Sequence, residues 1–81
     1  MIVYKDGWAE MLPESWISEK RNKDGLPTYQ VDLGFTETEG YWFCVETLGE
    51  GEPEYSTNYK TKEKAIKEAK KWMEDHKKQN E

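Results

Sequence analysis

The chain has 81 residues, of which 36% are charged and 35% hydrophobic, and its formal net charge is -5. This length allows one domain, over residues 1–81, and the acidic balance disfavours indiscriminate binding to polyanions. No apolar run approaches the roughly 18 residues that span a bilayer, so we expect a soluble, cytoplasmic protein with no membrane partner.

Aromatic residues make up 14% of the chain and include four tryptophans. Large rings bury roughly 150 to 250 Å² each, so a few of them can build the core of a small folded domain. Cys44 is the single cysteine, which excludes an internal disulfide and fits a reducing compartment.

Residues 1–15 form an N-terminal segment whose structure the sequence leaves open. Ile2-Val3-Tyr4 has the composition of an edge strand, and Asp6-Gly7 is typical of a turn. The stretch from Trp8 to Leu12 suits a strand or a helix, and Pro13 ends either one.

Residues 16–59 carry the patterns of antiparallel strands. Trp16 to Arg21 predicts a strand, because Asn22-Lys23-Asp24-Gly25 after it is strong hairpin chemistry. Apolar residues at every second position from Tyr29 to Phe35 then predict a strand with one buried face.

A second hairpin follows in the sequence. Glu39-Gly40 predicts a turn, and Tyr41 to Leu48 has the β-branched and aromatic character of a strand. Residues 49–53 are a loop by composition. The alternation of Tyr55, Thr57 and Tyr59 predicts one more strand, which leads directly into a helix.

The last third of the chain predicts a helix over residues 61–78. Thr61 suits the N-cap, and Glu63 lies in the first turn, where the helix dipole favours an acid. One apolar stripe follows the helical spacing and consists of Ala65, Ile66, Ala69, Trp72, Met73 and His76. The expected fold is therefore α+β: a small antiparallel sheet of three to five strands with one C-terminal helix packed across one face.

The acidic residues are distributed unevenly. Residues 29–59 contain no lysine or arginine, and they hold seven acids: Asp32, Glu37, Glu39, Glu46, Glu50, Glu52 and Glu54. Three of these acids crowd one loop, where like charges repel unless a basic partner relieves them. We expect this surface either to contact a basic protein surface or to be simply solvated. A calcium site is disfavoured, since the Asp-rich loop with a distal glutamate is missing.

Trp42 lies in a strand that is apolar at both parities for a few residues. If Phe43 faces the helix, Trp42 points to the opposite face of the sheet. It then either packs against Trp8 or Trp16, as the need for core area favours, or offers a stacking platform to a partner.

A second candidate surface lies on and before the helix. Its lysines are Lys60, Lys62, Lys64, Lys67, Lys71 and Lys78. Such a stripe could meet phosphates, but acids are interleaved with it and the helix has no arginine for bidentate contacts. A solvated helix face is the simpler interpretation.

Catalysis and metal binding find no support in the sequence. Cys44 needs a nearby base to act as a nucleophile, and nothing pairs it with His76, the single histidine. One cysteine and one histidine do not supply a zinc site. We therefore expect no catalytic residue, no metal and no cofactor.

From Trp16 onward, the strands followed by Tyr59-Lys60-Thr61-Lys62-Glu63-Lys64-Ala65 resemble the arm-type DNA-binding domain of tyrosine recombinases. The same region is similar to the second half of a double-stranded-RNA-binding domain and to HicB-like antitoxins. These resemblances imply a sheet followed by a helix. The recombinase domains read DNA with a basic sheet, whereas the sheet segments here are acidic, so no binding residue is carried over.

The function that the sequence favours is a small non-enzymatic protein-interaction module, an inhibitor or regulator, that presents its acidic surface and Trp42 to a basic protein partner. The alternative is a nucleic-acid-binding module that uses the helix lysines with Trp42 or Tyr41 as a stacking residue. A homo-oligomer formed through an open sheet edge is a further alternative.

Overall fold

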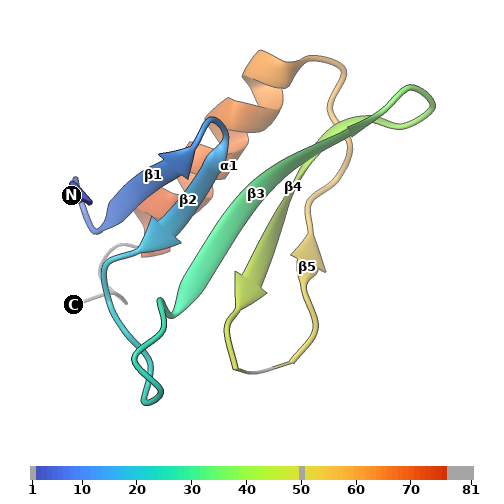
Figure 1. Cartoon of the computed structure of the whole chain (residues 1–81). Coiled ribbons are helices and arrows are strands. Elements are labelled where there is room, and N and C mark those ends of the chain that lie inside the picture. Colours follow the sequence, from blue (N-terminus) through green and yellow to red (C-terminus); the bar gives the residue numbers. More distant parts are fainter. Residues whose placement is uncertain (1, 50, 77–81) are drawn as a thin grey trace.

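A computed structural model describes residues 2–49 and 51–76 of the chain. It contains a five-stranded antiparallel sheet with one helix packed against it, so the expected α+β fold is confirmed (Figure 1). The elements are β1 (Trp8–Leu12), β2 (Ser15–Ser18), β3 (Tyr29–Thr36), β4 (Gly40–Thr47), β5 (Glu54–Tyr55) and α1 (Lys62–His76). The strands lie in the sheet in their sequence order, each beside its predecessor.

The core lies between α1 and one face of the sheet. Val31 on β3 is opposite Val45 on β4, and both are buried. Ala65 and Ala69 on α1 are 0% exposed, because their small side chains let the helix backbone approach the sheet closely. The alternation predicted for β3 and the apolar stripe predicted for α1 therefore identify the sheet face and the helix face that pack together.

Trp8 joins the first strand to the end of the helix. Its indole N–H donates a buried hydrogen bond of 3.0 Å to the main-chain carbonyl of Met73. The Trp8 ring also packs against Tyr29 and, edge to face, against Trp72. Aromatic rings thus supply much of the core area that the few aliphatic residues cannot.

The helix begins as its sequence predicts. The hydroxyl of Thr61 accepts a hydrogen bond of 3.2 Å from the Lys64 amide, which satisfies one of the free N–H groups of the first turn. Residues 77 and 78, with which the predicted helix ends, lie outside the described residues. Within residues 2–49 and 51–76, no helix is both long enough and apolar enough to cross a membrane.

Several expected boundaries were wrong. Ile2-Val3-Tyr4 is not a strand, which corrects the expected edge strand. Asp6-Gly7 forms the expected turn, and the stretch from Trp8 to Leu12, for which strand and helix were both open, is a strand. The strand expected from Trp16 to Arg21 ends at Ser18. There the buried hydroxyl of Ser18 accepts a hydrogen bond from the Tyr29 amide. This bond joins the end of β2 to the start of β3.

The strand expected through Tyr55, Thr57 and Tyr59 is also shorter. β5 has two residues, and Tyr59 returns to β4 only as an isolated bridge to Tyr41. Cys44 is opposite Tyr55, so four steps along this segment match three steps along β4. The extra residue interrupts the ladder, as in a β-bulge.

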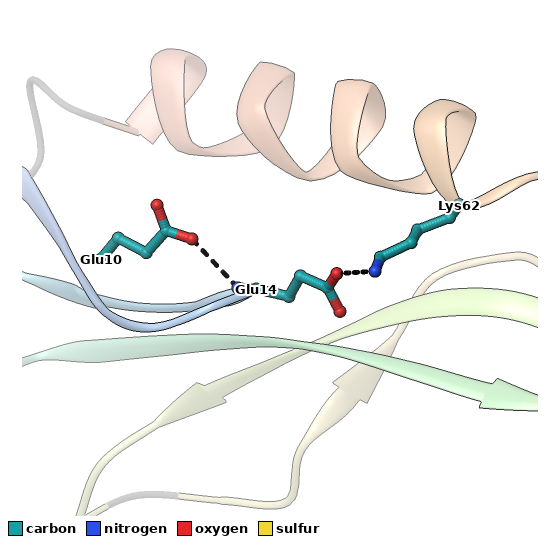
Figure 2. Close-up of polar contacts among 3 residues, drawn as sticks. All are labelled: Glu10, Glu14 and Lys62. Carbon is teal, nitrogen blue, oxygen red and sulfur yellow. Dashed lines mark hydrogen bonds and ion pairs between the residues drawn. The ribbon is translucent and has the colours of Figure 1, made fainter.

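The turn between β1 and β2 is tied to the start of the helix. Glu14 has a φ of 68°, which is uncommon for a residue with a side chain. Its amide donates to the Glu10 carboxylate at 3.1 Å, and its own carboxylate forms an ion pair with Lys62 (Figure 2). These contacts hold the left-handed residue between the sheet and α1.

Candidate functional site

The sheet face away from α1 carries the candidate site. Figure 1 shows α1 on one side of the sheet, and none of the described elements covers the other side. We call this second side the open face. Its strand residues, given by the register, are Ala9, Leu12, Ser15, Ile17, Gln30, Asp32, Gly34, Thr36, Gly40, Trp42, Cys44, Glu46 and Tyr55. They include two carboxylates and no lysine or arginine.

Trp42 lies on the open face, which corrects the expectation that it packs against Trp8 or Trp16. Those two tryptophans are buried on the helix side, because their strand positions share a face with Val31. Trp42 instead lies over Gly34, the residue opposite it on β3. A Cβ on Gly34 would be 2.5 Å from the indole Cε2, so the glycine leaves the space that the ring fills.

A pocket opens beside Trp42 on the β5 side. Its volume is about 210 Å³, and it is lined by Glu39, Trp42, Tyr55, Ser56 and Asn58. Tyr55 is 68% exposed and lies diagonally across from Trp42 on the same face. The pocket thus places two aromatic side chains and one carboxylate around a single space.

Asp32 and Glu46 share the open face with Cys44. The Ser15 hydroxyl donates to Asp32 at 2.5 Å, and the Gln30 amide donates to its other oxygen at 3.1 Å, so this carboxylate is held in place. Burial first, and then the charges of Glu46 and Asp32, raise the pKa of the Cys44 thiol above its ordinary value. The face therefore has a negative potential close to its centre.

The six predicted acids that the structure describes do not form one surface. Asp32 and Glu46 lie on the open face, whereas Glu37 and Glu39 lie at the β3–β4 hairpin. Glu52 lies in the β4–β5 loop at the other end of β4. At about 3.3 Å per residue, the eight residues of β4 separate the two ends by more than about 20 Å.

The sixth described acid also stands apart. Glu54 pairs with Val45 and so has the parity of the helix side. Glu50 lies outside the described residues. The structure therefore brings Asp32 and Glu46 together on the open face and places Glu39 apart from them, beside Trp42 at the hairpin end of β4.

The lysine stripe is partly neutralised. Lys62 is paired with Glu14, and Lys64 lies 3.5 Å from Glu68 one turn along the helix. Lys60, Lys67 and Lys71 are exposed, and Lys78 lies outside the described residues. Because two of its members have acidic partners, the stripe presents less free charge than its sequence suggests.

Cys44 and His76 lie on opposite sides of the sheet. Cys44 is on the open face, while the His76 ring stacks on Trp72 with ring centroids 3.8 Å apart. A thiol and an imidazole placed in this way cannot exchange a proton directly. In the part of the chain that the structure describes, no three His, Cys, Asp or Glu side chains gather as a metal site would require.

A larger pocket, of about 330 Å³, lies between β1 and α1. Its apolar floor consists of Trp8, Trp16 and Met73, whose burial belongs to the core. Its charged walls are mixed, with Lys5, Asp6, Glu10, Lys70 and Glu74. A wall of both signs selects no ligand charge, so the open face is the better candidate site.

Sequence reasoning found Trp42 and the acids but missed Tyr55 and Asn58 as neighbours of Trp42. Tyr55 was visible as part of an alternating pattern. The face on which its ring lies depends on the β4–β5 register, which the local pattern does not specify.

No protein family, curated protein or solved structure matches this chain.

Proposed function

We propose that this chain is a non-enzymatic protein-interaction module, acting as an inhibitor or regulator, whose open face binds a basic surface of another protein. The observation that carries the proposal is the uncovered face itself. It combines Trp42 and Tyr55 with the carboxylates of Asp32 and Glu46, and its strand positions include no base.

Aromatic residues at such a face suit an interface. Tyrosine and tryptophan are enriched among the residues that contribute most to protein binding, because they bury much area with few rotatable bonds. Carboxylates around them attract a basic partner and disfavour an acidic one. The same charges would repel the phosphates of nucleic acid, so we place the alternative of nucleic-acid binding second.

The arrangement also argues against self-association through this face. Two copies packed face to face would bring together two acidic faces with no base at their strand positions, and like charges in an interface are unfavourable. We therefore propose a different protein as the partner. A reducing compartment such as the cytoplasm suits the free Cys44 thiol on this face.

Affinity capture with matched variants tests the proposal. The tagged chain is used as bait in a lysate of the native host, beside an open-face variant, Asp32→Asn with Glu46→Lys, and a helix variant, Lys67→Glu with Lys71→Glu. We expect a basic protein to be captured by the wild type and the helix variant and to be lost with the open-face variant. Circular dichroism of each variant checks that the fold is kept.

Two outcomes would contradict the proposal. Capture that survives the open-face variant would remove the binding role of this face. Capture that is lost only with the helix variant, together with retention on nucleic acid that falls steeply with salt, would favour the lysine stripe instead.

A further inference from the structure

The pocket beside Trp42 exists because the indole leans away from β5. Trp42 is on β4, which lies between β3 and β5. Its ring lies over Gly34 on β3 and leaves the space above β4 and β5 open. Tyr55 bounds this space from β5, and Glu39 bounds it from the β3–β4 hairpin. The glycine thus decides where the tryptophan rests and, through it, where the pocket opens.

The position of Glu39 is fixed by its own hairpin. Its amide donates a hydrogen bond of 3.1 Å to the hydroxyl of Thr36, which holds the turn, and Gly40 follows with a φ of 84°. Such a φ is readily adopted by glycine and lets β4 begin immediately. The carboxylate therefore projects from an ordered turn and not from a long loop.

The lining of the pocket favours a cation. The π-faces of tryptophan and tyrosine attract a cation held within about 6 Å of the ring centre. The Glu39 carboxylate adds a negative charge at the rim, and no lysine or arginine lines the space. An anion would meet repulsion from this carboxylate, whereas a cation is attracted by it.

Hydrogen-bond acceptors distinguish between cations. The Asn58 side chain can accept through its carbonyl oxygen, whereas the Ser56 hydroxyl already accepts from the Phe43 amide and donates to the Thr57 carbonyl. A guanidinium carries five N–H donors in a plane, stacks on aromatic faces and is weakly hydrated. It can stack on a ring and donate to Glu39 and Asn58 together, which a trimethylated ammonium, with no N–H group, cannot do.

We propose that this pocket binds the guanidinium group of an arginine side chain on the protein partner. The inference rests on the proposed function and names the chemistry that its site recognises. Trp42 and Tyr55 provide the stacking surfaces, Glu39 accepts a charge-assisted hydrogen bond, and Asn58 accepts a further one.

Nuclear magnetic resonance tests the pocket with a defined probe. N-acetyl-L-arginine methylamide is titrated into the ¹⁵N-labelled full chain, and the Trp42 indole N–H and the amides of residues 39 and 55–58 are followed. We expect saturable shifts confined to these signals. The citrulline derivative has the same shape without the charge. Its affinity should therefore be lower by at least about tenfold, which is the scale of one charged hydrogen bond.

Two variants check the assignment. Glu39→Gln keeps the shape of an exposed side chain and should weaken binding of the probe by about tenfold. Trp42→Leu, made as a separate single variant, should weaken binding of the probe several-fold through the loss of the cation–π contact. Lys67→Gln, on the helix, is the matched control and should leave the affinity unchanged. One-dimensional spectra of each variant confirm that it is folded.

The inference would be overturned by equal shifts with the citrulline derivative or with N-acetyl-L-lysine methylamide, by unchanged affinity in Glu39→Gln, or by shifts outside the pocket. This failure differs from failure of the proposed function. If the probe does not bind but the Asp32→Asn, Glu46→Lys bait loses its partner, the open face remains the binding surface and only the arginine assignment is withdrawn.

Discussion

The indole of Trp42 covers Gly34, its cross-strand neighbour, and occupies the space in which any other residue would place its Cβ. Gly34→Ala should therefore push the ring from its position. We expect a loss of about 1 to 3 kcal/mol in the free energy of unfolding, the range for inserting a carbon into a packed site. Urea denaturation measures it.

The background variant Trp42→Leu provides the control for this prediction. Leucine lacks the indole atoms that the new methyl group would meet, and alanine suits a strand better than glycine. The cost of Gly34→Ala should then vanish or change sign. Equal costs in the two backgrounds would show that the ring does not depend on the glycine.

Trp8→Phe should destabilise the protein through its hydrogen bond as well as its packing. The substitution removes the indole N–H and leaves the buried Met73 carbonyl without this donor. The hydrogen bond should account for about 1 kcal/mol beyond the loss of apolar area. Trp16→Phe is the matched control, since Trp16 is equally buried and its ring donates no hydrogen bond among the described residues. Similar melting curves for the two variants would contradict the prediction.

Thr61→Ala should fray the first turn of α1. The Lys64 amide loses its side-chain acceptor, and removal of an N-cap costs about 1 kcal/mol. Hydrogen exchange should accelerate at Lys64 and its neighbours and remain unchanged in β3. Thr61→Ser keeps the acceptor and should behave as the wild type; faster exchange in that variant as well would assign the effect to lost packing.

Cys44 should react slowly with iodoacetamide near pH 8.5. Only the thiolate reacts, and burial together with Glu46 and Asp32 raises the pKa of this thiol above its ordinary 9.0. Glu46→Gln removes one of the negative charges, so it should lower the pKa and speed alkylation. In denaturant the two proteins should react at the same rate. A rate in the folded variant no faster than in the wild type would exclude the charge effect.

The same raised pKa has a consequence for stability. The unfolded chain releases the thiol proton at a lower pH than the folded chain, so the folded state binds more protons in the interval between the two pKa values. The free energy of unfolding should fall as pH rises above the ordinary pKa of a thiol. Cys44→Ser should lessen this part of the pH dependence.

The strongly periodic segments could be predicted from sequence. The alternation from Tyr29 to Phe35 reports a strand that is buried on one side, and the stripe through Ala65 and Ala69 reports the helix face that covers it. These patterns follow from local backbone geometry and so need no knowledge of the partner element. The N-cap at Thr61 is likewise a local interaction.

The features that were predicted wrongly depend on the register between neighbouring strands. Whether Trp16 lies with Val31 or with Trp42 is decided by how β2 aligns with β3, and a shift of one residue would exchange the faces. The extra residue between Tyr55 and Tyr59 shortens β5 for the same reason. The pocket beside Trp42 combines both effects, so its lining could not be predicted without the fold.

Because each strand pairs with the strand before it in the sequence, the sheet can be assembled by a succession of nearby chain closures. Low contact order of this kind favours rapid folding, since little loop entropy is lost before contacts form. The hydrogen bond from Trp8 to Met73 spans 65 residues and joins the two ends of the chain. Hairpins should therefore form early, and the joining of helix to first strand should complete the native state.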